Sequence, residues 1–253
     1  MGFIVLFYIM DPEKIKEYFS SDGVVCDYAR AVLQVGLWES ERVVFSEYFK
    51  KTARLLELGC GAGRISCGLW RLGYRNITAT DFAPGMVEVA KNIFDDLKCG
   101  VSCQIEDATR LTFGDSSFEG AVFGFNGLMQ IPLRERRRAA MREIFRVLRH
   151  GSYFIFTTHD RENPKNAAYW ERERGAWKGG AKPENLEEFG DICYESPHGK
   201  VFIHSPTRDE VEEDMSLAGF EKVFEAARGE IARETQAVVN FSDECIFRVY
   251  LKR

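Results

Sequence analysis

The sequence predicts an α/β fold, in which helices cover both faces of a largely parallel β-sheet. From residue 54 onward, short apolar segments alternate with segments whose apolar residues recur at helical spacing. The chain has 253 residues, of which 45% are hydrophobic and 29% charged, so it can bury a large core beneath a polar surface. Strands that alternate with helices pair in parallel through right-handed crossover connections. We therefore expect a doubly wound sheet.

Residues 1–51 are predicted to form an N-terminal arm and a helical cap. The opening MGFIVLFYIM is too short to span a bilayer and lacks the basic start and small-residue cleavage site of a secretory signal. Residues 1–9 are either an extension upstream of a natural start at Met10 or an arm that packs on the domain. Three helices are expected next, in PEKIKEYF, YARAVLQVGLW and SERVVFSEYFKK, with Ser40 as the N-cap of the third.

Five strands and their helices are expected between residues 52 and 160. The strand segments are RLLELG, NITATD, VSCQIED, FEGAVFGFN and SYFIFTTHD. The helices after the first, second and fourth strands begin near Arg64, Pro84 and Arg134, and each carries one apolar stripe.

An insertion at about residues 161–205 interrupts this alternation. It is charged and contains several aromatic residues, so we expect it to form a lid over the site. The helix in TRDEVEEDMSLAGF follows, with a capping box of Thr207 and Glu210. EKVFEAAR and ECIFRVYLK then predict an antiparallel pair at the sheet edge. Residues 52–253 are thus expected to form one domain that carries the insertion.

The segment LLELGCGAGRIS marks the candidate site. Gly59, Gly61 and Gly63 lie on the turn between the first strand and its helix, where ligands bind in such folds. Glycines there let a ligand approach the main chain, and the helix begins with free N–H groups. Cys60 is a small residue that fits the same turn.

Acidic residues at the strand ends predict an adenosine site. Asp81 ends the second strand, and its carboxylate can accept two hydrogen bonds from a ribose diol. Asp107 ends the third strand and can accept a proton from an adenine amino group. The simpler alternative is that both aspartates are helix or turn caps.

The glycine spacing differs from that of a dinucleotide fold, which needs G-x-G-x-x-G. Here Gly63 comes one residue early and Arg64 follows it. Glu57, at the end of the strand, would repel a diphosphate but tolerate an ammonium or sulfonium. The pattern therefore favours a ligand that carries adenosine and a positive charge.

Five segments in succession resemble the motifs of class I S-adenosylmethionine-dependent methyltransferases: ELGCGAGR, TATDFAPGMVEVA, EDATRLTF, FEGAVFGFNGLMQIP and REIFRVLRHGSYFIF. The resemblance runs from about residue 52 to 160. It implies a Rossmann-like seven-stranded sheet in the order 3-2-1-4-5-7-6, with the last strand antiparallel. RHGS replaces the usual proline and two glycines at a turn that lies away from the cofactor.

The same resemblance implies where S-adenosylmethionine would bind. Asp81 would bind the ribose, Phe82 and Met86 would pack near the adenine, and Asn126 would lie beside the methionine portion. Asp107 and Ala108 would contact the adenine edge. The other expected cofactor-binding residues are those of the turn: Glu57, Gly59, Cys60, Gly61, Gly63 and Arg64. For Arg64 a solvated surface position, and for Asn126 a simple turn cap, are the alternatives.

Charge and cysteine content restrict the other classes of function. The net charge of −5 argues against nucleic acid, although RERRR at 134–138 is locally basic. Seven cysteines without a CxxC pair indicate a reduced, cytoplasmic chain, and the four histidines have no zinc spacing, so no metal is expected. His159 follows the fifth strand and is either a base or a side chain bonded to backbone.

We therefore expect a methyltransferase that moves the sulfonium methyl by in-line displacement to a small molecule, held between the N-terminal helices and the insertion. The alternatives are a methyltransferase acting on RNA or protein, a non-catalytic S-adenosylmethionine-binding protein and a nucleotide-dependent oxidoreductase. The sequence leaves the acceptor, the methylated atom, any catalytic base and the oligomeric state open.

Overall fold

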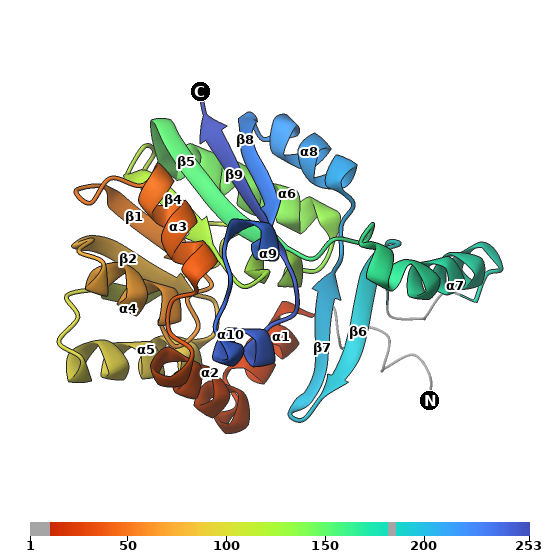
Figure 1. Ribbon diagram of the computed structural model, residues 1–253, viewed down its shortest axis with the longest axis horizontal. Helices are drawn as coiled ribbons and strands as arrows, with labels where there is room; N and C mark the ends of the chain where they lie inside the picture. The colour runs from red at the N-terminus through yellow and green to blue at the C-terminus, as the bar shows by residue number, and fades with distance from the viewer. Residues whose placement is uncertain (1–10, 182–185) are drawn as a thin grey trace.

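A seven-stranded sheet forms the centre of the computed structural model, which describes residues 11–181 and 186–253 (Figure 1). Its order is β3-β2-β1-β4-β5-β9-β8, and β9 runs antiparallel to both neighbours. The strands are β1 (Arg54–Leu58), β2 (Asn76–Asp81), β3 (Ser102–Ile105), β4 (Phe118–Phe123), β5 (Leu148–Thr158), β8 (Phe220–Ala227) and β9 (Ile246–Lys252). The predicted order is confirmed. Two further strands lie in the sequence between the fifth strand and the last pair, and they form a separate two-stranded sheet.

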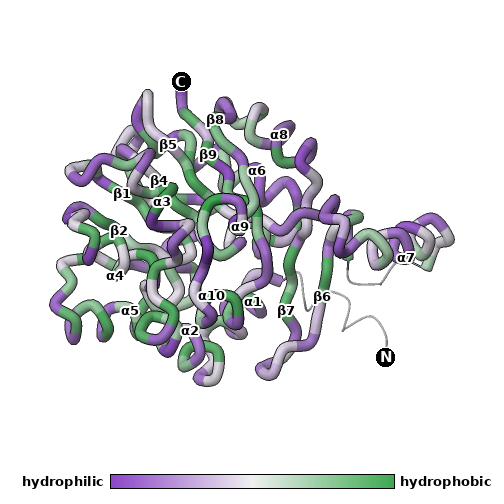
Figure 2. Tube along the Cα trace, in the orientation of Figure 1, coloured by the Kyte–Doolittle hydropathy of each residue, from purple (hydrophilic) through white to green (hydrophobic). Residues whose placement is uncertain are grey.

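Helices cover the two faces of this sheet. One face carries α3 (Glu39–Tyr48), α4 (Arg64–Arg71) and α5 (Pro84–Asp96), and the other carries α6 (Arg134–Val147) and α8 (Arg208–Leu217). Neighbouring residues of β1 show the two layers, because Leu55 packs with α3 and α4 while Leu56 packs with α6 and α8. Strands buried on both faces are apolar along most of their length, as the green central strands of Figure 2 show.

The N-terminal helices are α1 (Pro12–Phe19), α2 (Asp22–Gln34) and α3. The expected N-cap at Ser40 is wrong, because α3 begins at Glu39 and Trp38 is its N-cap. The Glu41 carboxylate accepts a hydrogen bond of 2.9 Å from the Trp38 backbone N–H and so fixes this earlier start. Residues 1–9, whose role the sequence leaves open, lie outside the described residues.

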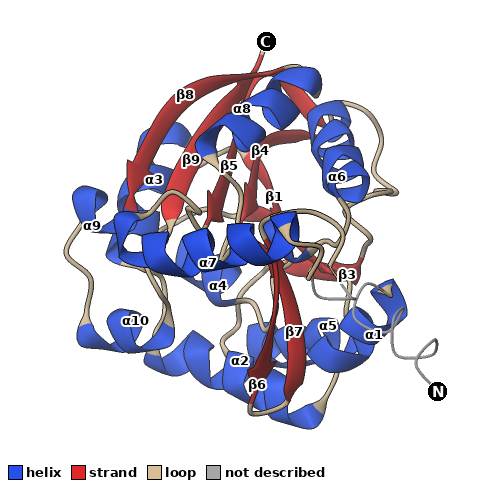
Figure 3. Ribbon diagram, turned by 90° about the vertical axis from the view of Figure 1, so that its right-hand side faces the viewer, coloured by secondary structure: helices blue, strands red, loops and turns tan. Residues whose placement is uncertain are grey.

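The insertion contains a hairpin that the sequence analysis missed. After the short turn η2 (Pro164–Asn166), helix α7 (Ala167–Lys178) projects from the body, and β6 (Asp191–Ser196) and β7 (Gly199–His204) extend toward α1 and α2 (Figures 1 and 3). At the hairpin tip, the Tyr18 hydroxyl lies 2.8 Å from the Ser196 hydroxyl. His198 Nε2 lies 2.8 Å from the Asp27 carboxylate. The hairpin therefore bridges the insertion and the N-terminal helices.

Buried ionic groups hold the base of this hairpin. Asp191 and His204 are paired across the two strands, with 2.8 Å between the carboxylate and Nδ1. Arg161, which is buried, donates to the Glu210 carboxylate of α8 at 2.5 Å. His204 Nε2 also lies 3.7 Å from the Glu210 carboxylate, so this group of side chains connects the hairpin to α8.

The connection between β8 and β9 is a second unpredicted feature. It contains α9 (Arg228–Ile231) and α10 (Gln236–Phe241), and α10 lies near α2 in both views (Figures 1 and 3). The Glu234 carboxylate accepts two hydrogen bonds of 3.0 Å, from the backbone N–H groups of Glu39 and Ser40. This contact anchors the connection to the start of α3. None of the described helices has the length and apolar character that crossing a membrane requires.

Candidate functional site

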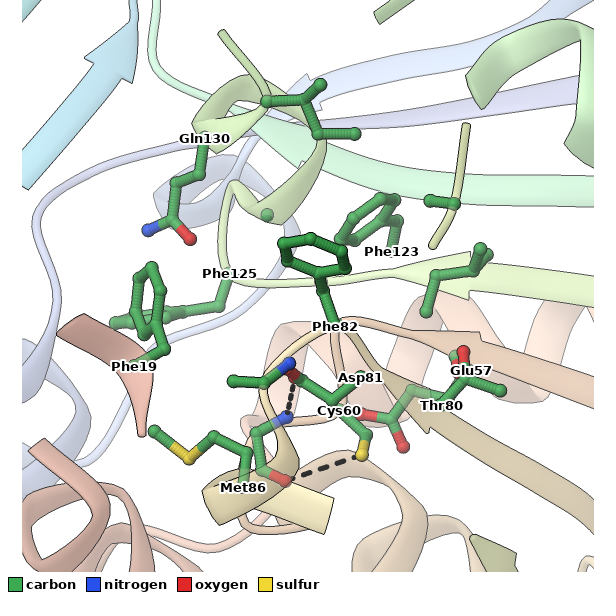
Figure 4. Close-up of a pocket in the computed structure, with 18 of the residues that line it drawn as sticks. Phe19, Glu57, Cys60, Thr80, Asp81, Phe82, Met86, Phe123, Phe125 and Gln130 are labelled. Atoms are coloured by element: carbon green, nitrogen blue, oxygen red, sulfur yellow. Dashed lines mark hydrogen bonds between the residues drawn. The ribbon is translucent and has the colours of Figure 1, made fainter. Parts of the chain in front are cut away.

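A cavity opens at the carboxyl ends of the parallel strands, where folds of this type bind ligands (Figure 4). Loops after β1, β2, β3 and β4 form its floor, and α1, α2, α10 and the turn η1 (Gly127–Gln130) contribute to its walls. The sequence-predicted residues that line it are Glu57, Gly59, Cys60, Gly61, Arg64, Asp81, Phe82, Met86, Asp107 and Ala108. The fold thus brings together ten residues that are scattered over 52 positions, from Glu57 to Ala108.

The glycines of the first turn adopt backbone conformations that other residues avoid. Gly59, Gly61 and Gly63 have φ angles of 58°, 54° and 90°, all in the left-handed region. A Cβ atom at Gly61 would lie 2.8 Å from the ring of Tyr28, so a larger residue would also clash there. Gly63 is the N-cap of α4 and packs against Phe94 instead of lining the cavity.

Asp81 supports this turn directly. Its carboxylate accepts hydrogen bonds from the backbone N–H of Gly61, at 2.8 Å, and of Ala83, at 2.9 Å (Figure 4). Burial raises the pKa of the Asp81 carboxyl, although these two bonds partly offset the effect. The carboxylate is therefore fixed in orientation at the cavity wall.

Asp107 lies on the loop after β3, and Phe82 lies on the loop after β2. The Asp107 carboxylate accepts from the Thr109 backbone N–H at 2.8 Å and faces Arg136 at 3.7 Å. The ammonium of Lys16 lies 5.0 Å from the centre of the Phe82 ring. Asp107 is consequently a turn cap as well as a cavity residue, so both readings of this aspartate from the sequence are compatible with its position.

Glu57 is a buried carboxyl at the base of the cavity. It is 2% exposed and bonds to the Ser66 hydroxyl through a short hydrogen bond. Burial raises the pKa of Glu57 to about 8, so this group is mostly the neutral acid at neutral pH when no cation lies beside it. A cationic ligand would favour its ionised form.

Arg64 is a buried member of an ion pair and not a solvated side chain. Its guanidinium donates two hydrogen bonds of 2.6 Å to the Glu41 carboxylate and one of 2.8 Å to the Gly36 carbonyl. Because these contacts occupy the guanidinium, Arg64 contributes to the cavity mainly through its position beneath the glycine turn.

Asn126 lies outside the cavity lining. Its Nδ2 is 3.2 Å from Nε2 of His159, and its buried Oδ1 has no hydrogen-bond partner among residues 11–181 and 186–253. His159 Nδ1 lies 3.3 Å from the Glu244 carbonyl, and burial lowers the pKa of the imidazole. His159 therefore contacts the backbone, which was the alternative to a role as a base. Like Asn126, it does not line the cavity.

Aromatic rings that the sequence analysis did not assign to the site form the upper wall. Phe19 and Tyr28 lie 6.1 Å apart, Tyr28 and Phe125 also 6.1 Å apart, and Phe125 stacks on Phe241 at 4.9 Å. These residues come from α1, α2, the loop after β4 and α10. No local sequence pattern links four such distant segments, so the signal for this wall is absent from the sequence.

A second cavity lies next to the first, on the side of the hairpin. It lies between α1 and β7, and Ile15, Phe19 and Gln130 line both cavities. Val201 and Phe202 supply its wall on the hairpin. The expected lid therefore borders only this second cavity. Helix α7 projects from the body (Figure 1), and none of its residues lines either cavity.

Comparisons with known proteins agree with this geometry. The family model described as a methyltransferase domain matches residues 56–156. The O-methyltransferase resE of Aspergillus sclerotiorum is 32% identical over 53% of this chain and 56% of its own length. The O-methyltransferase cnsE of Penicillium expansum is 30% identical over 44% of this chain and 39% of its own length. The chain therefore spans less than two thirds of these relatives.

A solved structure of a SAM-dependent methyltransferase from Methanosarcina mazei shares the fold. Its TM-score is 0.68 at 22% identity, over 83% of this chain and 96% of that one. At this identity the likeness concerns the fold, which extends well beyond the segment that the family model matches.

Proposed function

We propose that this chain, whose residues 56–156 match a family model described as a methyltransferase domain, transfers the methyl group of S-adenosylmethionine to a small-molecule acceptor. One observation carries the proposal: a single cavity joins the glycine turn, Asp81 and Asp107 at one end to an aromatic wall at the other. The first end suits an adenosine, and the second suits an apolar reactant.

The cofactor would lie along the glycine turn. Asp81 would accept hydrogen bonds from the ribose hydroxyls, and Phe82 and Met86 would pack on the adenine. The ammonium of the methionine portion would lie near Glu57, whose carboxyl can ionise to meet it. S-adenosylmethionine supplies an activated methyl group, so the protein chiefly aligns the acceptor and excludes water.

The RERRR segment does not supply a basic surface for RNA. Its arginines are paired with acidic side chains of the same fold, among them Arg134 with Glu213 and Asp214, and Arg137 with Glu188. With these pairs formed, the segment has little free positive charge for phosphates. A small molecule remains the better candidate for the acceptor.

The acceptor would extend from the aromatic end of the first cavity into the second, and Val201→Trp tests this. The larger side chain fills the space between α1 and β7 without burying a charge. We expect methyl transfer to fall by about tenfold or more, because the acceptor is displaced, while affinity for S-adenosylhomocysteine changes by less than about twofold. Acceptor-dependent formation of S-adenosylhomocysteine, followed by mass spectrometry, measures the effect.

Val223→Trp is the matched control, because Val223 is 43% exposed on β8 and lines neither cavity. Both variants should melt near the temperature of the wild type. If Val201→Trp turns over like the control, the acceptor is not bound between α1 and β7.

Cofactor binding should release protons through Glu57. Below a pH of about 8, Glu57 is mostly the neutral acid when no cation lies beside it, and a bound ammonium favours the carboxylate. Affinity for S-adenosylhomocysteine should therefore rise with pH up to about 8, and this contribution should level off above it. Calorimetry in buffers of different ionisation enthalpy counts the released protons.

Glu57→Gln is the control, since the amide keeps the shape but cannot ionise. It should abolish proton release near neutral pH and leave only the pH dependence of the ligand itself. Equal proton release by the wild type and Glu57→Gln would show that Glu57 does not face the ammonium.

A further inference from the structure

The charged side chains around the acceptor end already have partners in the protein. Lys16 pairs with Glu13, Lys200 with Glu195, and Lys14 with Glu17. Deeper in the cavity, Arg64 pairs with Glu41 and Arg136 with Asp107. An acceptor with a full charge at its reacting end would lose its hydration and find no free group of opposite sign among the described lining residues, apart from the carboxyls of Glu57 and Asp81 at the end assigned to the cofactor.

Two neutral polar groups that line the first cavity, unlike these charged side chains, have no hydrogen-bond partner in the described part of the protein. The amide of Gln130 and the hydroxyl of Tyr28 have no hydrogen-bond partner in the described ranges, 11–181 and 186–253. Gln130 lines both cavities, so it stands at their junction, and in Figure 4 its amide points toward Phe19 and Phe125. A carboxamide offers one acceptor oxygen and two N–H donors to a ligand at that junction.

The surfaces around Gln130 are flat and apolar. Phe125 and Phe241 are stacked with an interplanar angle of 18°, and Tyr28 meets Phe125 edge-on at 82°. Ile15 and Ile131 add aliphatic contacts. Such walls favour a planar ring over a flexible polar chain, because ring-to-ring contacts gain energy beyond the area they bury.

We propose that the acceptor is a neutral, planar, apolar molecule with a phenolic or enolic hydroxyl, and that Gln130 binds this hydroxyl and determines specificity for it. This inference rests on the proposed function and deepens it. The two fungal relatives named above are O-methyltransferases, which agrees with an oxygen nucleophile.

The chemistry of the step fits this class of acceptor. The only carboxylate on the hairpin side of the cavities, within the described lining, is Glu17, which is 63% exposed and paired with Lys14. A phenol has a pKa of about 10 and can ionise without a buried base. The hydroxyl proton passes to water, an oxygen lone pair forms the new bond to the methyl carbon, and the C–S electron pair returns to sulfur. Gln130 donates an N–H to the oxygen and orients it for displacement.

Binding of three naphthalene probes tests the acceptor class. With S-adenosylhomocysteine present, 2-naphthol should bind at least about tenfold more tightly than 2-naphthoate or 2-naphthylmethylammonium, because only the first is neutral. Gln130→Leu should weaken 2-naphthol binding by about tenfold and leave affinity for S-adenosylhomocysteine unchanged. Gln130→Glu should reverse the preference in favour of the ammonium probe. Calorimetry measures all these affinities.

Gln34→Leu provides the matched control, because Gln34 is exposed at the end of α2 and lines neither cavity. Equal or tighter binding of a charged probe by the wild type, no binding of any probe, or equal effects of Gln130→Leu and Gln34→Leu would each overturn the inference. Failure to bind S-adenosylhomocysteine itself would instead overturn the proposed function.

Discussion

Asp81→Ala is expected to weaken binding of S-adenosylhomocysteine by about a hundredfold, and Asp107→Ala by less than about tenfold. The Asp81 carboxylate would accept two charge-assisted hydrogen bonds from the ribose in a desolvated site, and their loss costs about 2–3 kcal/mol. The Asp81 carboxylate also accepts hydrogen bonds from the backbone N–H groups of Gly61 and Ala83 and so supports the turn. Asp107 would make one bond to an amino group, and nearby backbone groups can replace part of it.

Calorimetric titration of both variants measures this difference. Asp81→Asn serves as the control for shape, because it keeps one acceptor oxygen but no charge, and it should fall between the wild type and Asp81→Ala. Circular dichroism should show that all variants are folded. Small and equal losses at positions 81 and 107 would show that the adenosine lies elsewhere.

Glu41→Ala is expected to lower the free energy of unfolding by about 3–5 kcal/mol, because it leaves the buried Arg64 guanidinium without its counter-charge. Glu41 is 1% exposed, and its carboxylate contacts both guanidinium N–H groups at 2.6 Å. The same carboxylate caps the Trp38 backbone N–H, so the start of α3 is also weakened. Urea denaturation followed by tryptophan fluorescence gives the free energy.

Glu39→Ala is the matched control in the same helix turn. Glu39 pairs with Arg42 at 2.8 Å on the exposed surface, with both side chains nearly half exposed, and such pairs contribute at most about 1 kcal/mol. If the two variants lose equal stability, the Arg64–Glu41 pair does not hold the glycine turn in place.

The fold from β1 to β5 could be predicted because its signals are local. Each strand is a short apolar segment, and the helices between them carry apolar stripes at helical spacing. NITATD, for example, matches β2 (Asn76–Asp81) residue for residue. The order of the strands came from the resemblance to methyltransferases and not from these patterns.

The hairpin and α10 could not be predicted for physical reasons. In β6 only Asp191 is fully buried, so the strand lacks the alternation that marks a half-buried sheet. Helix α10 spans 6 residues, fewer than two turns, and is too short to show a helical period. Both elements depend on contacts with distant segments, which the local sequence does not report.

In the candidate site, too, some features could be predicted from the sequence and others could not. The glycine turn and Asp81 follow from residue type and position at strand ends, whereas the pairing of Arg64 with Glu41, 23 residues earlier, depends on how α3 packs on α4. The aromatic wall and the role of Gln130 likewise depend on packing among four separate parts of the chain.

The central claim is that this cavity binds S-adenosylmethionine, and a calorimetric titration of the wild-type protein tests it most directly. We expect saturable heat with S-adenosylmethionine and with S-adenosylhomocysteine, with dissociation constants of about 1 µM to 100 µM. NADH should give none, because the turn lacks the G-x-G-x-x-G spacing of a dinucleotide site. Absence of heat with both sulfur compounds, or saturable binding of NADH in the same cavity, would contradict the account.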